Sequence, residues 1–205
     1  MGKLEANKQQ KLTSLLNTAF NLFTTQGVTK TSIAEISQKA GIAKGTFYLY
    51  FKDKYDIRNR LISHESSKLF KNAVADLEEF SKEKNEQLGF EEKIIFIINH
   101  IVDELNSNQT LLTFISKNLS WGIFKEALTT KVASDDINFK DVYYEMINAE
   151  DISLEEPEIM LFLIVELVSS TCYSAILYKE PADIDTIKPY LFKTVLAIIR
   201  EHTIR

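Results

Sequence analysis

The sequence predicts an all-α protein, with an N-terminal three-helix bundle that holds a helix-turn-helix and a larger helical domain after it. Apolar residues recur at helical rather than alternating spacing along nearly the whole chain. Only six glycines and three prolines interrupt the 205 residues, and 45% of them are hydrophobic, enough for a real core. We expect the two domains to cover residues 1–53 and 54–205.

The N-terminal bundle is predicted from three helices. The first runs from about Ala6 to Thr25 along one apolar stripe, and Gly27 stops it. The pattern S-x-x-E beginning at Ser32 is typical of a capping box, so a second helix starts there and ends near Ala40. A third, very short helix is expected from Lys44 to Tyr50, which completes a helix-turn-helix pattern.

The rest of the chain is predicted to be helical with short connections. Asp53 is the expected N-cap of a long fourth helix that reaches Phe80 and is followed by a polar loop at 81–89. The further helices that the apolar spacing predicts are Glu91–Leu105, Leu111–Leu119, Ile123–Lys131, Phe139–Ile147, Glu155–Tyr178 and Ile184–His202.

The predicted compartment is the cytoplasm, without a membrane partner. The N-terminus lacks the apolar core of a signal peptide, and a single cysteine, Cys172, excludes an intramolecular disulfide. Residues 159–178 are long enough to span a bilayer, yet they contain Glu166 and a run of three hydroxyl residues. Because basic and aromatic flanks are also absent, the favoured interpretation is a helix buried on most of its circumference, with one face on the core and another on a second subunit.

Charge is divided unevenly along the chain. The net charge is −5, but residues 1–60 carry ten Lys/Arg against four Asp/Glu, net +6. The remaining residues carry fourteen against twenty-five, net −11. A localised basic face attracts phosphates, so the asymmetry favours a nucleic-acid partner for the N-terminal part.

The side chains of the short third helix divide into two groups when they are placed about 100° apart. Phe47 and Phe51 share the side that faces the core. Gly45 and Leu49 point directly away from it, so backbone can approach a base or phosphate at Gly45, and Leu49 can pack on a thymine methyl group. Lys44 adds a positive charge at the helix N-terminus, where an anion is already favoured.

The edges of this helix carry hydroxyl groups. Thr46 and Tyr50 flank one side of the outward face, and Tyr48 flanks the other. All three could donate to phosphate or base acceptors. For the two tyrosines the alternative, that they edge a small core, stays open. Gly45 is harder to explain that way, because glycine costs about 1 kcal/mol inside a helix.

Residues 31–54, TSIAEISQKAGIAKGTFYLYFKDK, resemble the DNA-binding segment of the TetR family of bacterial transcriptional regulators, and the likeness covers about residues 8–60. It implies a homodimer with a C-terminal domain that binds a small ligand and dimerises through its last two helices. It also implies that Thr31 and Lys54 contact phosphates. The residues expected at the DNA are Lys44, Gly45, Thr46, Tyr48, Leu49 and Tyr50.

Leu49 departs from the pattern of this family. Many members have a tyrosine or another polar residue at this position. A polar contact is therefore expected to be absent at Leu49, and the DNA sequence that is preferred is expected to differ.

The last two predicted helices carry the expected dimer interface. A stripe on the final helix pairs with a preceding helix that is apolar all round, so two copies could form a four-helix interface. The stripe residues are Ile187, Leu191, Val195 and Ile198. Packing inside one chain is the alternative interpretation of the same stripe.

A pocket for the small ligand is predicted only loosely. Aromatic and polar candidates for its lining are Phe96, His100, Phe114, Trp121, Phe124, Tyr143, Phe162 and Tyr173. Ordinary core packing explains each of them as well. The acidic body disfavours an anionic ligand and leaves an apolar or cationic one open.

No enzyme motif is present. The three histidines lie in no metal-ligand spacing, and there is no phosphate-binding loop or nucleophile motif, so no catalytic residue, metal or cofactor is expected. The predicted function is a ligand-responsive, sequence-specific transcriptional regulator, a repressor that a small molecule releases from a palindromic operator. The alternative is a helical protein-interaction module that uses its basic end on an acidic partner.

Overall fold

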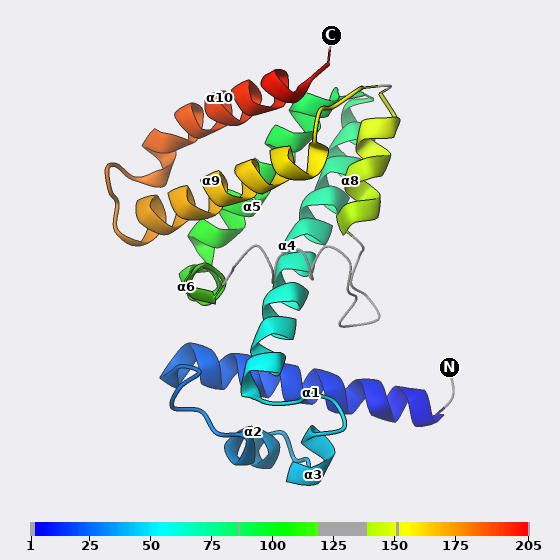
Figure 1. Ribbon diagram of the computed structural model, residues 1–205, viewed down its shortest axis with the longest axis vertical. Coiled ribbons are helices and arrows are strands. Elements are labelled where there is room, and N and C mark those ends of the chain that lie inside the picture. The colour runs from blue at the N-terminus through cyan, green and yellow to red at the C-terminus, as the bar shows by residue number, and fades with distance from the viewer. Residues whose placement is uncertain (1–2, 86, 119–138, 151, 205) are drawn as a thin grey trace. The chain divides into compact units, whose positions relative to one another are not determined.

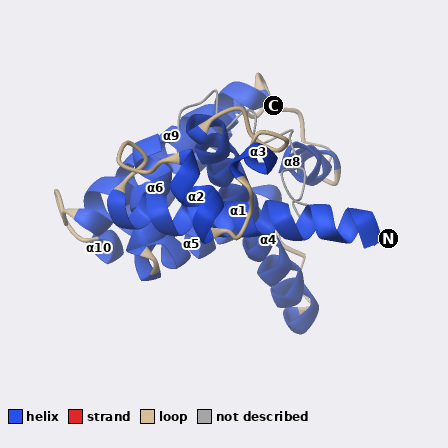
Figure 2. Ribbon diagram, turned by 90° about the horizontal axis from the view of Figure 1, so that it is seen from below, coloured by secondary structure: helices blue, strands red, loops and turns tan. Residues whose placement is uncertain are grey.

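The computed structural model describes residues 3–85, 87–118, 139–150 and 152–204. In these ranges the protein consists of helices and loops, and the one extended pairing is an isolated bridge between Leu154 and Thr203 (Figure 2). The all-α prediction is confirmed. Contacts group the described residues into two compact units that divide between Ser66 and Ser67, inside one long helix.

The N-terminal unit contains α1 (Lys3–Gln26), α2 (Ile33–Lys39), α3 (Lys44–Phe47) and the first part of α4 (Lys54–Lys84), as Figure 1 shows. Each of these helices contributes or adjoins apolar side chains that meet in one core. Its buried members are Leu15, Leu16, Ala19, Leu22, Phe23, Ile36, Phe47, Phe51, Ile57, Leu61 and Ile62. Burial of these side chains fixes the short helices α2 and α3, which are too short to be stable alone.

The predicted helix starts are confirmed by their caps. The Oγ of Ser32 accepts from the Glu35 N–H at 3.1 Å at the start of α2. At the start of α4, Asp53 Oδ1 accepts from the N–H groups of Tyr55 and Asp56 at 2.7 and 2.9 Å. Both caps satisfy donors that have no partner within the helix.

Two predicted helix ends were wrong. The third helix ends at Phe47 rather than Tyr50, and residues 48–50 continue as tight turns. The fourth helix runs to Lys84, through the first part of the predicted loop at 81–89. Residues 81–84 contain no glycine or proline and are compatible with a helix. The helix ends where Asn85 adopts a φ of 49° in the left-handed region.

The C-terminal unit contains the rest of α4 with α5 (Phe90–Ser107), α6 (Gln109–Asn118), α8 (Phe139–Asn148), α9 (Pro157–Leu177) and α10 (Ile184–His202). In this unit α9 and α10 pack along each other, and α5 packs against both (Figure 1). The bounds of α5, α6, α8, α9 and α10 agree with the predicted ones to within two residues at each end. The helix predicted at Ile123–Lys131 lies outside the described residues.

Two kinds of contact hold the helices of the C-terminal unit together. Phe70 of α4 and Phe139 of α8 have ring centroids 3.9 Å apart, inside a core that α4, α5 and α8 share. Arg200 of α10 donates from Nε and Nη2 to the two oxygens of Glu91 on α5, at 3.0 and 2.8 Å. This two-bond pair lowers the pKa of the Glu91 carboxyl, so the carboxylate stays ionised at neutral pH.

Helix α9 is long and apolar enough, by length and composition, to cross a bilayer. A third of its most apolar stretch is buried inside the unit. Since core helices of soluble proteins pass the same test, this observation is weak evidence for a membrane.

Ser37 gives a prediction about stability. Its side chain is buried on α2, and its hydroxyl has no hydrogen-bond partner. Ser37→Ala is expected to raise the free energy of unfolding by up to about 1 kcal/mol, because alanine removes an unsatisfied polar group and favours a helix. Urea denaturation followed by circular dichroism measures the change.

Ser14 supplies the matched control for that experiment. Its Oγ donates to the Ala40 carbonyl at 3.1 Å, so Ser14→Ala is expected to lower the free energy of unfolding by about 1 kcal/mol. A loss of stability in Ser37→Ala as large as in Ser14→Ala would contradict the expectation.

Candidate functional site

The recognition segment, residues 44–51, is fixed to the N-terminal unit by two phenylalanines. Phe47 is fully buried and Phe51 is 2% exposed, with ring centroids 5.5 Å apart. Between them the Leu49 N–H donates to the Thr46 carbonyl at 3.1 Å, and the Phe51 N–H donates to the Phe47 carbonyl at 3.0 Å. The inward direction predicted for both rings is confirmed, and the backbone between them continues in helical turns.

The exposed surface of the recognition segment is formed by Lys44, Gly45, Tyr48 and Leu49. Leu49 is 81% exposed and Tyr48 is 52% exposed. A Cβ added at Gly45 would meet no atom within 4 Å, so nothing inside the protein requires glycine there. The lack of a side chain at Gly45 therefore matters only for a partner molecule that approaches the helix from outside the chain.

The edges of the segment contact the rest of the unit. Tyr50 is half-buried, and its hydroxyl donates to the Lys8 carbonyl of α1 at 3.4 Å. Tyr48 lies edge-on to Phe47 with ring centroids 5.6 Å apart, and Thr46 is half-buried. Tyr50 thus helps to position the segment, whereas the half-exposed Tyr48 remains free to meet a ligand.

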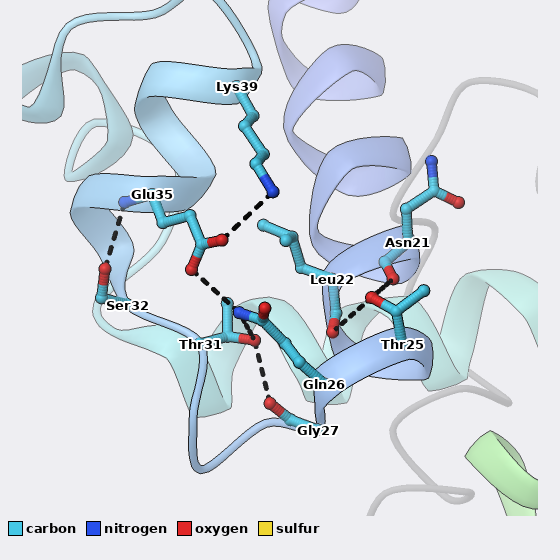
Figure 3. A network of polar contacts seen from close by, with 9 residues as sticks. All are labelled: Asn21, Leu22, Thr25, Gln26, Gly27, Thr31, Ser32, Glu35 and Lys39. Atoms are coloured by element: carbon cyan, nitrogen blue, oxygen red, sulfur yellow. Dashed lines mark hydrogen bonds and ion pairs between the residues drawn. The ribbon is translucent and has the colours of Figure 1, made fainter.

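Thr31 closes the turn between α1 and α2. It is 1% exposed, and its Oγ1 donates to the Gly27 carbonyl at 2.9 Å. Gln26 reaches from the end of α1 and donates from Nε2 to Thr31 Oγ1 at 3.3 Å and to Glu35 Oε2 at 2.9 Å (Figure 3). The phosphate contact expected of Thr31 does not fit this hydroxyl, which is buried and already bonded.

Glu35 joins that network to the surface of α2. Its Oε1 lies 3.2 Å from Lys39 Nζ, one helical turn later (Figure 3). The hydrogen bond from Gln26, followed by the one from Lys39, lowers the pKa of the Glu35 carboxyl. An ionised carboxylate near the start of α2 is also favoured by the helix dipole.

The start of α4 presents cations around a tyrosine. Lys54 Nζ donates to the carbonyls of Thr29 and Thr31 at 2.9 and 3.2 Å, so the ammonium holds the loop before α2. Tyr55 is half exposed, and its ring centroid lies 5.7 Å from Lys54 Nζ and 5.4 Å from Arg58 Cζ. Lys54 keeps one donor for a phosphate besides the two that these carbonyls take.

Three residues near this site were absent from the predicted set: Gln26, Tyr55 and Arg58. Continuing the helical-wheel argument into the first turn of the fourth helix would have placed Tyr55 and Arg58 on the surface beside Lys54. No local pattern indicates the role of Gln26, because its partners depend on how α1 and α2 meet.

The structure brings together only part of the predicted ligand pocket. Phe96 and His100 line an open groove of about 560 Å³ along α4 and α5. His100 Nδ1 lies 3.0 Å from Asp76 Oδ2, and its Nε2 lies 3.5 Å from Glu104 Oε2. The described walls of this groove are polar and acidic rather than aromatic.

The other pocket candidates are dispersed. Phe114 is buried on α6, and Phe162 is half-buried on α9. Tyr143 is buried, which raises the pKa of its phenol, and its hydroxyl donates to the Pro157 carbonyl at 3.0 Å. The hydroxyls of Tyr173 and Tyr178 are 3.0 Å apart. Trp121 and Phe124 lie outside the described residues.

The predicted interface stripe on α10 is divided between core and surface. Leu191 and Val195 are buried against the chain's own helices, so a second copy would not reach them. Ile187 and Ile198 are half-buried at the edge of the helix.

Within the described residues, no group of three or more His, Cys, Asp or Glu side chains could hold a metal ion.

The N-terminal unit is similar in sequence to bacterial transcriptional regulators. A family model described as bacterial regulatory proteins, tetR family, matches residues 15–61. The HTH-type transcriptional regulator AcrR of Shigella flexneri is 40% identical over 55 residues, 27% of this chain and 26% of that protein. The fatty acid metabolism regulator protein of Bacillus subtilis (strain 168) is 31% identical over 93 residues, 45% of this chain and 44% of that protein. The matches thus span less than half of these relatives.

Solved structures share the fold over nearly the whole chain. A TetR-family transcription regulator from Shewanella sp. PV-4 superposes with a TM-score of 0.64 at 15% identity, covering 95% of this chain and 99% of that one. FadR of Bacillus subtilis in complex with stearoyl-CoA gives a TM-score of 0.61 at 18% identity, covering 91% and 98%.

The fold and the exposed recognition segment define a helical protein of the helix-turn-helix class. Within that class, residues 15–61 are similar to the tetR family of bacterial regulatory proteins.

Proposed function

We propose that this protein is a transcriptional regulator that binds a palindromic operator as a homodimer and is released by a small molecule, acting as a repressor in the cytoplasm. The observation that carries the proposal is the exposed surface of the recognition segment. This surface is anchored by the buried side chains of Phe47 and Phe51. Its backbone is accessible at Gly45, and it lies in the basic part of the chain. A positively charged, low surface on a short helix suits the major groove.

The experiment that tests DNA binding is selection of bound sites from random double-stranded DNA by the full-length protein, followed by footprinting. A palindrome with half-sites about 34 to 36 Å apart, or a multiple of that distance, is expected. Retention on heparin without any sequence preference would instead favour the helical protein-interaction module.

The proposed dimer would use the exposed apolar residues of α9 and α10. Ile159 and Leu163, one helical turn apart on α9, are 50% and 42% exposed, and Tyr190 on α10 is 71% exposed. Exposed apolar side chains on two adjacent helices suit a symmetric contact between copies. Light scattering of the unchanged chain and of Leu163→Glu tests it: a dimer that becomes a monomer is expected, and a monomeric unchanged chain would oppose the proposal.

The effector is proposed to bind within the C-terminal unit. Stearoyl-CoA is the first probe, because one similar protein is a fatty acid metabolism regulator and another was crystallised with stearoyl-CoA. The groove beside His100 carries Asp76, Asp103 and Glu104, which disfavours an anionic headgroup at that place. Loss of the gel shift on adding stearoyl-CoA would identify the class, and cationic amphiphiles are the comparison set.

Lys54 should affect both stability and DNA binding. Lys54→Ala is expected to lower the free energy of unfolding by about 1 kcal/mol, because two carbonyls lose a donor. We also expect the salt dependence of operator affinity to weaken by about one unit for each phosphate contact that is lost. Urea denaturation and gel-shift titrations at several salt concentrations measure the two effects.

Lys54→Gln separates the two roles, since glutamine keeps a neutral donor and loses the charge. Its stability should lie nearer to the unchanged chain, with the same reduced salt dependence as Lys54→Ala. An unchanged salt slope in both variants would remove Lys54 from the phosphate contacts and leave it as a loop-holding residue only.

A further inference from the structure

We propose that Leu49 selects a thymine in each half of the operator by packing on the C5-methyl group of that base. The inference rests on the DNA binding proposed above and adds which base the recognition segment reads. It concerns an apolar contact, whereas the other residues of the exposed surface offer charge, backbone or a hydroxyl.

The exposure of Leu49 is the first observation. At 81% it has the largest exposed fraction among the large hydrophobic side chains that the structure describes. A single exposed leucine is ordinary on a protein surface. What distinguishes Leu49 is its place: the buried side chains of Phe47 and Phe51 lie two residues away on either side.

The backbone geometry around Leu49 is the second observation. Its N–H donates to the Thr46 carbonyl at 3.1 Å, and the next two residues donate back to Phe47. Residues four apart on a helical turn share a face, so Leu49 lies over the same side as Gly45. Because Gly45 has no side chain, the edge of a base pair can approach this face of the helix until it touches the leucine.

The positive charge around Leu49 points to nucleic acid as the partner that this surface contacts. Lys44 and Lys52 are exposed on either side of Leu49, within the part of the chain that carries a net +6. Among the base edges in the major groove, thymine presents an apolar methyl group at C5, whereas cytosine has only a hydrogen at C5 and an amino donor at C4. A leucine with no polar atom therefore favours thymine over cytosine.

A competing position for the side chain exists within the chain. Leu49 borders a depression of about 300 Å³ whose other walls include Lys8 and Leu12 of α1 and Arg60 of α4. Folding back on Leu12 would take the leucine away from a base, and the experiment below distinguishes the two positions.

The test replaces single thymines of the selected operator by deoxyuridine, which lacks only the methyl group. At one symmetric pair of positions we expect about a fourfold loss of affinity for each half-site, the effect of one buried methyl group. Leu49→Ala should lose affinity for the thymine operator by a similar factor and no longer distinguish uracil from thymine there. Leu49→Met, with an unbranched side chain of similar size, should keep most of the discrimination.

Circular dichroism and urea denaturation should show both variants folded, since the side chain is exposed. Equal sensitivity of the unchanged chain and Leu49→Ala to uracil at every position would overturn this inference and leave the DNA-binding function standing. Failure to form any sequence-specific complex with the thymine operator would overturn the proposed function and, with it, this inference.

Discussion

Gly45→Leu is expected to abolish operator binding, by at least about a hundredfold, while the protein stays as stable as the unchanged chain or becomes slightly more stable. The structure leaves open space around the missing Cβ, so the protein itself accommodates the larger side chain. Leucine also favours a helix by up to about 1 kcal/mol over glycine. Only a partner pressed against this surface would meet the side chain. Gel-shift titration and urea denaturation of the same preparation measure both effects.

Gly41 provides the control for the change at Gly45. A Cβ there also meets nothing within 4 Å, but its φ of 69° lies in the left-handed region. Gly41→Leu should therefore lower the free energy of unfolding by roughly 1 to 2 kcal/mol, through backbone strain alone. If Gly45→Leu bound the operator normally, the recognition surface would have to lie elsewhere.

Phe47→Ala should have the largest effect on folding in the N-terminal unit. Its ring is fully buried against Phe51, and removing such a ring costs about 3 to 5 kcal/mol through lost burial and the cavity left behind. Hydrogen exchange should speed up in α1, α2 and α3 and change little in α9 and α10. Exchange is measured by segment, because the chain contains two compact units and Phe47 lies in only one of them.

Leu49→Ala is the matched control for Phe47→Ala. It removes a large apolar side chain from the same segment at an exposed position, so stability should change by less than about 0.5 kcal/mol. Comparable destabilisation by the two changes would mean that the inward and outward directions of the segment are misassigned.

Local chemistry determined the parts that the sequence predicted well. Helical geometry alone separated Phe47 and Phe51 from Gly45 and Leu49, since residues four apart share a face. Asp53 was recognisable as a cap because its carboxylate meets donors only two and three residues away. Such features depend on neighbours in the sequence and need no knowledge of the fold.

The roles that depend on distant segments could not be predicted in this way. Lys54 bonds to carbonyls 25 and 23 residues earlier, whose positions follow from the path of the loop before α2. The stripe on α10 looked like an interface, but a stripe alone cannot say whether its partner is the same chain or another, and Leu191 and Val195 face inward. The aromatic pocket candidates were dispersed for the same reason, because helix packing places them.

Neither the missing side chain at Gly45 nor the exposed side chain of Leu49 is needed to hold the protein's own structure together. This has a consequence for how such proteins diversify. Under the proposed DNA-binding role, mutations at these two positions are expected to change the DNA sequence that is bound and to leave folding intact. A duplicated gene could then acquire a new target site through folded intermediates. Thr31, Gln26 and Phe47 lack that freedom, since each holds the scaffold in place. Lineages should therefore vary first at the exposed positions and keep the buried network while their regulatory targets separate.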